Sequence, residues 1–244
     1  MNISEYRGVM VFAEQRRGEI QKVAYELLGA GRGIADTLQE PLIAVLAGTH
    51  LTDAQAASLI AHGADRVILV DDPRLGVYMT EPFTKALTAV ISTEKPGIVF
   101  FGATTIGRDL APRVSARLKT GLTADCTALA IDDASRNLLM TRPAFGGNIM
   151  ATIICPEHRP QMSTVRPGVM RRLEADTARN GETVRFACKI EPADVNVEII
   201  EEVVQKEEKK NIEDASVLVA GGRGLGNPEN FQSLQNLAEM LGGQ

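Results

Sequence analysis

Residues 98–118 read IVFFGATTIGRDLAPRVSARL, and this stretch contains a complete strand–turn–helix unit. The apolar run at 98–101 has the β-branched and aromatic content of a buried strand. A turn follows over residues 102–109, and apolar residues then recur with helical spacing, which predicts a helix over 109–118. A strand followed by a helix of this length is typical of the βαβ units that build parallel sheets.

The same unit repeats toward the amino terminus. Apolar strands are expected at residues 9–13, 42–47 and 66–70, and helices at 20–38, 52–61 and 82–93. The strands carry few polar residues, as expected when helices cover both faces of a sheet. Thr52 and Asp53 supply capping residues for the second helix, and Pro96 separates the third from the next strand. We therefore predict an α/β fold whose first domain is a parallel-sheet, nucleotide-binding-like domain.

The pattern changes after residue 118, where segments become short and β-branched. We expect strands, some of them antiparallel, that extend or flank the sheet at residues 124–131, 138–143, 150–155 and 161–165. Residues 186–190 and 195–203 are expected to add a further hairpin or edge. The first domain is thus predicted to contain an additional β-rich segment.

A charge run separates this domain from the last part of the chain. Residues 201–210 read EEVVQKEEKK, which predicts an exposed linker or linker helix that acts as a hinge. A new α/β unit follows, with a strand at 216–220, a glycine-rich turn at 221–224, and a helix at 229–241 that Asn227 and Pro228 begin. The predicted domains are 1–200, a charged linker at 201–213, and 214–244 as the start of a second domain. One βα unit has no sheet partners, so we expect either a missing remainder, which we favour, or packing on the first domain.

Composition excludes several classes of function. Apolar residues make up 44% of the 244-residue chain and the formal net charge is −5, so no field attracts nucleic acid. The longest apolar runs are far below the roughly 20 residues of a membrane span, so no membrane insertion is expected. The three cysteines and three histidines lack metal-site spacing. The odd cysteine count and the absence of a signal peptide predict a cytoplasmic location.

The glycine-rich turn at 221–224 is the strongest candidate for ligand chemistry. Gly221, Gly222 and Gly224 would let the backbone approach a diphosphate closely, near the start of a helix whose N–H groups favour anions. Arg223 adds a charged, bidentate donor for a phosphate or a flavin edge. The spacing is neither the three-glycine dinucleotide fingerprint nor a P-loop, and a plain tight turn explains it equally well.

Two further turns carry candidate residues. Thr104, Thr105 and Arg108 follow the strand at 98–101 and could hold a phosphate at a helix N-terminus, or they could form a helix cap beside a surface Arg–Asp pair. In the stretch 141–148, TRPAFGGN, Arg142 and Phe145 could meet a flat conjugated ligand, with Arg142 donating to a ring nitrogen or carbonyl. The alternative for this stretch, which we favour on the residues alone, is a Pro/Gly turn with a solvated arginine.

Taken together, these motifs resemble the alpha subunit of electron-transfer flavoproteins. The matching stretches occur in the family's order at 102–113, 120–127, 142–148, 221–225 and 229–231, and the resemblance extends from residue 9 to residue 241. It implies a heterodimer in which the first domain pairs with a similar domain of the beta subunit. It also implies that the second domain binds FAD through the turn that contains Arg223. The family's other FAD contacts lie beyond residue 244.

The sequences of residues 142–148 and 165–169 resemble those of the electron-bifurcating branch of the family, in which the beta subunit carries a second FAD. Arg142 would then reach that flavin across the subunit interface. The implied role is electron transfer through FAD between NADH or a dehydrogenase and a partner such as an acyl-CoA dehydrogenase. Two other hypotheses remain open. One is an adenine-nucleotide-binding module of the nucleotide hydrolase-like α/β type without flavin, and the other is a structural subunit that scaffolds a flavin held by its partner.

Overall fold

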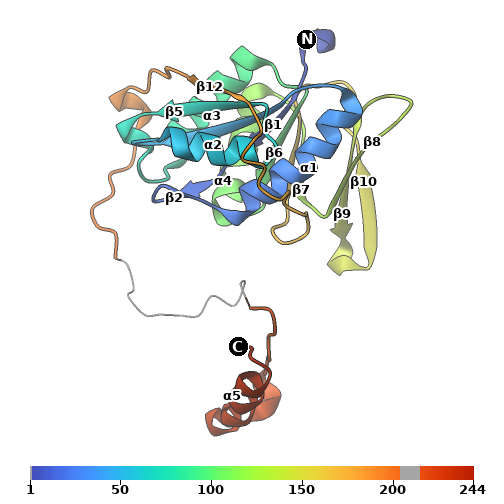
Figure 1. Ribbon diagram of the computed structural model, residues 1–244, viewed down its shortest axis with the longest axis vertical. Coiled ribbons are helices and arrows are strands. Elements are labelled where there is room, and N and C mark those ends of the chain that lie inside the picture. The colour runs from blue at the N-terminus through green and yellow to red at the C-terminus, as the bar shows by residue number, and fades with distance from the viewer. Residues whose placement is uncertain (1, 204–214) are drawn as a thin grey trace. The chain divides into compact units, whose positions relative to one another are not determined.

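The computed structural model describes residues 2–203 and 215–244, which belong to two compact units, Met1–Glu198 and Ile199–Gln244. Each unit is described by itself below, and Figure 1 shows both along the chain. The predicted hinge at 201–213 lies largely outside the described residues and stays a prediction.

The first unit is built on a seven-stranded parallel sheet with the order β12-β5-β4-β1-β6-β11-β7. Its strands are β1 (Val9–Phe12), β4 (Leu42–Gly48), β5 (Arg66–Asp71), β6 (Ile98–Gly102), β7 (Leu122–Cys126), β11 (Gln161–Val165) and β12 (Glu182–Arg185). The parallel sheet predicted from the apolar runs is confirmed. β11 was expected within the β-rich segment, but it lies inside this sheet between β6 and β7.

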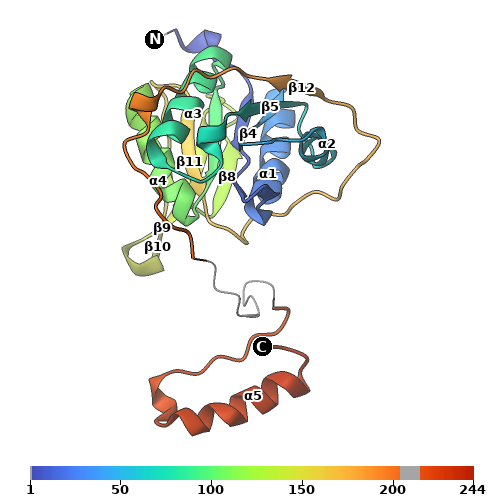
Figure 2. The same cartoon turned by 90° about the vertical axis from the view of Figure 1, so that its left-hand side faces the viewer.

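Four helices cover the two faces of this sheet, as Figure 2 shows. They are α1 (Lys22–Leu38), α2 (Asp53–Ala61), α3 (Thr80–Glu94) and α4 (Thr105–Leu118). Alternate strand residues point to opposite faces: Val9 and Val11 pack with α1 and α2 in one apolar cluster, whereas Met10 and Phe12 pack with α3 and α4 in another. Burial on both faces is the reason that the strands contain almost only apolar residues.

Helix α4 begins four residues earlier than the predicted start at Asp109. The Thr104 side chain accepts a hydrogen bond from the Gly107 backbone N–H at 3.0 Å and so caps the helix. Gly107 has no side chain, and a Cβ there would overlap the carbonyl oxygen of Gly102 in β6. The glycine therefore lets the first turn of the helix lie directly against the strand.

The predicted strand at 124–131 is two strands in two sheets. β7 belongs to the parallel sheet, while β8 (Ala128–Ile131) pairs with β9 (Leu138–Ala144) in an antiparallel sheet of order β10-β9-β8. β10 (Ile149–Ile153) completes this smaller sheet. The β7 backbone changes direction at Asp125, whose φ is 63°. A second small hairpin joins β2 (Gln15–Arg16) and β3 (Glu19–Ile20).

The predicted hairpin or edge at 186–190 and 195–203 is wrong. The edge strand is β12, which pairs with β5, and the described residues at 186–190 and 195–203 form no strand. Phe186, Cys188 and Ile190 pack against the sheet through their side chains instead. The ion pair between Lys85 of α3 and Asp194, at 2.5 Å, joins this segment to the domain. Side-chain burial here replaces a backbone ladder.

The second unit contains the helix α5 (Phe231–Met240), preceded by 3-10 turns at Arg223–Leu225 and Pro228–Asn230. The predicted strand at 216–220 is wrong for this structure, because a strand needs a neighbouring strand to form a ladder. Only Gln244 pairs with this segment among the described residues: Val219 N–H donates to its carbonyl at 2.7 Å, and its own N–H donates to Val217 at 3.0 Å.

Candidate functional site

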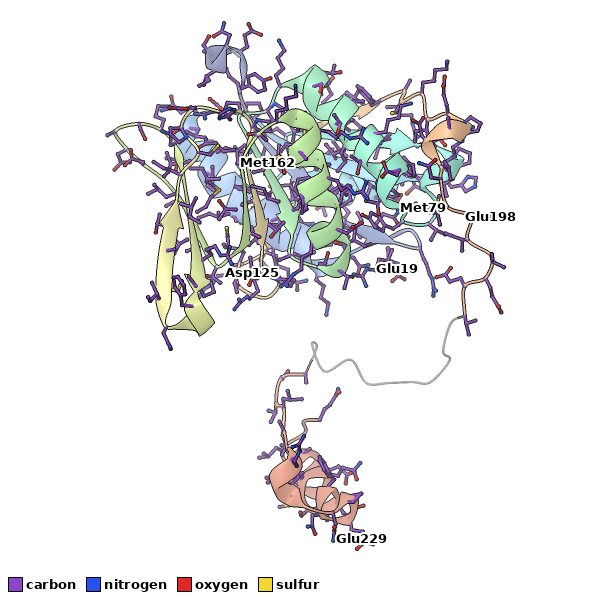
Figure 3. All side chains as sticks on the ribbon, turned by 180° about the vertical axis from the view of Figure 1, so that it is seen from behind. Glu19, Met79, Asp125, Met162, Glu198 and Glu229 are labelled. Atoms are coloured by element: carbon purple, nitrogen blue, oxygen red, sulfur yellow. The ribbon has the colours of Figure 1, made fainter. Side chains whose placement is uncertain are left out.

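The strand order of the first unit reverses at β1. β4 and β5 lie on one side of β1 and β6 lies on the other, with α1 and α4 on opposite faces. In open α/β sheets, ligands bind outside the carboxyl ends of the strands at such a point. Asp125 and Glu19, labelled in Figure 3, both lie on the side of the sheet where the strands have their carboxyl ends.

A buried carboxylate lies just beyond the carboxyl ends of the paired strands β1 and β6. Glu14 follows β1 and its side chain is 1% exposed. It accepts hydrogen bonds from the Thr104 hydroxyl and from Arg16, whose Nε lies 3.2 Å and Nη2 3.1 Å away. Arg16 Nη2 also lies 3.4 Å from the Thr105 hydroxyl. A phosphate entering here would meet a carboxylate that already uses the local donors.

These contacts decide between the two interpretations of residues 104–108. Thr104 caps α4 and donates to Glu14, and Arg108 donates through Nε to the Ala103 carbonyl at 2.8 Å. Arg108 also pairs with Asp125 at 3.4 Å. The contacts match a helix cap beside an Arg–Asp pair rather than a phosphate site, although the aspartate is not the neighbouring Asp109.

Asp125 is the centre of a charged cluster that sequence reasoning missed. It accepts from Arg166 Nε at 3.1 Å and Nη2 at 2.7 Å, in addition to Arg108. The hydrogen bond from Arg166 is the main reason that the pKa of Asp125 lies below its usual value. Asp125 and Arg166 are distant in sequence, and no local pattern marks them as partners.

Arg142 lies on β9, opposite Ala151 of β10. The predicted loop at 141–148 is therefore a β-hairpin whose turn is Phe145–Gly147. The Arg142 Nε is buried and has no hydrogen-bond partner among the described residues. Phe145, at the turn, is 84% exposed.

The hairpin is joined to the Asp125 cluster through the backbone. Thr127 N–H donates to the Thr141 carbonyl at 2.8 Å, and Arg166 N–H donates to the Cys126 carbonyl at 2.9 Å. Burial raises the pKa of the Cys126 thiol to about 11, and the nearby Arg142 charge opposes that rise. The thiol is therefore protonated at neutral pH, which suits a structural rather than a nucleophilic role.

The glycine-rich turn belongs to the second unit. Gly221 packs closely against Leu225 and Leu234, and a Cβ there would require the ends of both side chains to shift. Gly222 and Gly224 have no neighbouring atoms within 4 Å of a would-be Cβ, and Arg223 is exposed. An open backbone beside an exposed guanidinium fits an anionic diphosphate. These residues lie in the second unit, whereas Arg142 lies in the first.

Comparison with protein-family models identifies the family to which this chain belongs. The family model for the electron transfer flavoprotein domain matches residues 9–191, which include the whole parallel sheet and the Arg142 hairpin. The chain belongs to the electron transfer flavoprotein family. A second model, the electron transfer flavoprotein FAD-binding domain, matches residues 211–244 and so includes the turn at Arg223. FAD is the cofactor of this family, and the predicted fold class and cofactor are confirmed.

Similarity to individual proteins of known name extends this result. A "Protein FixB" from Clostridium saccharobutylicum is 50% identical over 243 residues, covering 100% of this chain and 72% of the relative. The electron transfer flavoprotein subunit alpha of Clostridium acetobutylicum is 49% identical, covering 100% of this chain and 73% of the relative. An acryloyl-CoA reductase electron transfer subunit beta from Anaerotignum propionicum is 41% identical, over 98% of this chain and 71% of the relative. The predicted resemblance to electron-transfer flavoprotein alpha subunits is confirmed.

Within residues 2–203 and 215–244, no helix is both long and apolar enough to cross a membrane.

Proposed function

We propose that this chain acts as the alpha subunit of a heterodimer and passes electrons through FAD between NADH or a dehydrogenase and a partner such as an acyl-CoA dehydrogenase. The observation that carries the proposal is the presence of both family domains, in order, on one chain. The relative named as an acryloyl-CoA reductase electron transfer subunit supports a partner that acts on a coenzyme A ester. The predicted cytoplasmic location and the domain limits at 200 and 213 remain part of the proposal.

The β9–β10 hairpin is the surface that we propose for the beta subunit. It exposes a group of large apolar side chains: Phe145 at 84%, Met150 at 56%, Ile149 at 54%, Ile154 at 51% and Ile153 at 38%. Large exposed apolar side chains gathered on one hairpin are typical of a protein interface. Aromatic and Met side chains are also enriched in interface cores.

In the second unit we propose that Arg223 and the backbone of Gly221, Gly222 and Gly224 hold FAD. The support is the exposure of Arg223 and the open backbone at Gly222 and Gly224. Arg223 would donate to the diphosphate or to the ring edge as a charged, bidentate group. Gly221 would act indirectly, by allowing Leu225 and Leu234 to pack under the turn.

We further propose that Arg142 and Phe145 face a second flavin held mainly by the beta subunit, as the electron-bifurcating hypothesis requires. The support is the position of Arg142 in the β9–β10 hairpin and the exposed ring of Phe145 at its turn. A flavin supplies hydride and single-electron transfer. A fixed guanidinium beside its ring stabilises the negative charge that reduction adds, so it raises the potential.

The Arg142 proposal has a direct test in the assembled heterodimer. A positive charge a few ångströms from the reduced ring stabilises the negative charge on it by a few kcal/mol at an effective dielectric near 20. We expect Arg142→Ala to lower the potential of one flavin by on the order of 100 mV, since a tenfold change corresponds to 59 mV for one electron. Arg142→Lys should recover only part, because it lacks the planar fork. Unchanged potentials of both flavins in a spectroelectrochemical titration would leave Arg142 as a turn arginine.

The competing functions are separated by one measurement. The buried Glu14 carboxylate beyond the carboxyl ends of β1 and β6 disfavours an adenine-nucleotide-binding module, because it occupies the position that this fold offers to phosphates. The intact mass and flavin count of the purified complex would test the proposal. A yellow two-chain complex supports it, whereas a colourless chain that binds ATP would support the nucleotide-binding module. Loss of all flavin on removal of the second chain would support a scaffold role.

A further inference from the structure

Asp125 holds an unusual backbone conformation at the carboxyl end of β7. Its φ of 63° lies in the left-handed region, and the pairing of β7 with β11 shifts register between Ser163 and Val165. The Thr164 hydroxyl oxygen accepts from the Asp125 N–H at 2.9 Å and stabilises this turn of the chain. Bulges that redirect one side chain are over-represented beside functional sites, and a left-handed non-glycine residue costs free energy that other contacts must offset.

The bulge aims the Asp125 carboxylate at arginines from separate elements. Arg166 pairs with it side-on through Nε and Nη2, at 3.1 and 2.7 Å, and Arg108 of α4 approaches at 3.4 Å. The side-on pair leaves the Nη1 amino group of Arg166 directed away from Asp125. Both arginines are largely on the surface, at 60% exposure for Arg108 and 45% for Arg166, whereas the Asp125 side chain is 24% exposed. Asp125 therefore pairs with two side chains that are themselves largely exposed.

Arg142 belongs to the same group of charges. The Thr127–Thr141 backbone hydrogen bond fixes β9 beside the end of β7, and the Asp125 carboxylate is stabilised by Arg142 as well as by the other two arginines. Asp125 thus pairs with two guanidinium groups, and the third, Arg142, acts on it only through its charge, so the cluster keeps an excess of positive charge. Removing the charge of Asp125 would increase that excess.

We propose that Asp125 partly balances the charge of Arg142, and that it holds the potential of the flavin facing the β9–β10 hairpin below the value that the arginines alone would set. The proposal rests on the proposed position of Arg142 beside that flavin. The proposal predicts the direction of each effect on the flavin potential: Arg142 makes the ring easier to reduce, and Asp125 partly cancels this effect. A residue that only supported the fold would not shift the potential in the direction opposite to Arg142.

The test is a spectroelectrochemical titration of the FAD-loaded heterodimer carrying Asp125→Asn. Asparagine has the same shape and tolerates a positive φ, so the bulge is retained. Removing this partly solvent-screened charge should favour the reduced flavin about threefold, or about +30 mV for one electron. Arg108→Gln, which removes one positive charge from the same cluster, should give a smaller shift of the opposite sign.

The matched control is Asp132→Asn, which makes the same charge change in the turn before β9, where Ser135 is the partner. It should leave the potential unchanged. If Arg142→Ala lowers the potential but Asp125→Asn gives a zero or negative shift, this inference is wrong while the proposed flavin position stands. If Arg142→Ala also has no effect, the proposed flavin position fails and the inference fails with it. Thermal unfolding of each variant separates loss of fold from the electrostatic effect.

Discussion

Phe145 offers the sharpest test of the proposed interface with the beta subunit. Its side chain is 84% exposed in the described unit, so replacing it with alanine removes almost no core contact. A phenylalanine side chain has on the order of 200 Å² of surface, so docking could bury about 170 Å². At about 25 cal/mol per Å², this burial would stabilise the heterodimer by up to about 4 kcal/mol.

Truncation of a central aromatic anchor commonly costs about 2–4 kcal/mol in binding. We therefore expect Phe145→Ala to weaken heterodimer affinity by about 30-fold to 1,000-fold while its unfolding midpoint stays near that of the wild type. Affinity is measured by titrating the purified beta subunit into this chain by calorimetry. Most of the change should appear as faster dissociation.

A matched control uses an apolar residue far from the hairpin. Val77 is 45% exposed and precedes α3, which lies across the sheet from β9. Val77→Ala should leave the affinity unchanged. Wild-type affinity of Phe145→Ala would refute the reasoning, because a ring so exposed cannot be central to an interface and contribute nothing to it.

Three further predictions follow from individual contacts. Arg223→Ala should weaken FAD binding by about 1.5–3 kcal/mol if its hydrogen bond is charge-assisted, and flavin retention in a dialysis series measures this. Asp125 has a lowered pKa because Arg166 hydrogen-bonds to it, so its contribution to stability is present above the unfolded pKa of about 3.9 and is lost as the pH falls through the lower folded value. Asp125→Asn should therefore flatten the acid limb of an unfolding-midpoint profile, and an unchanged limb would show that the pair is not stabilising. Gly29→Ala should destabilise the first unit by about 1–3 kcal/mol, because its Cβ would overlap the carbonyl of Arg171, while Gly33→Ala on the same helix, where nothing lies within 4 Å, should be neutral or stabilising in thermal unfolding.

The parallel sheet could be predicted because its cause is local. Apolar runs such as 42–47 and 66–70 can be buried on both faces only between two layers of helices, and the structure has strands at Leu42–Gly48 and Arg66–Asp71. Thr52 marked the start of α2 through the short-range chemistry of a capping box, which the structure confirms. The order of weak motifs along the chain was enough to indicate the family.

Other features depended on long-range pairing, which local patterns do not encode. β11 has the same β-branched character as an antiparallel strand, and only the space between β6 and β7 decided its neighbours and direction. The strand predicted at 216–220 had suitable residues, but it forms no ladder with the described chain beyond Gln244.

The candidate site divides in the same way. Arg142, Phe145 and Arg223 could be named from the sequence, because an arginine or aromatic residue next to glycines already implies an accessible group with a defined chemistry. The tertiary structure alone placed Glu14 beyond the carboxyl ends of β1 and β6 and gathered Arg108, Arg142 and Arg166 around Asp125. The physical reason is that a charge acts on whatever folding brings near it, and the distance along the chain has no part in that interaction.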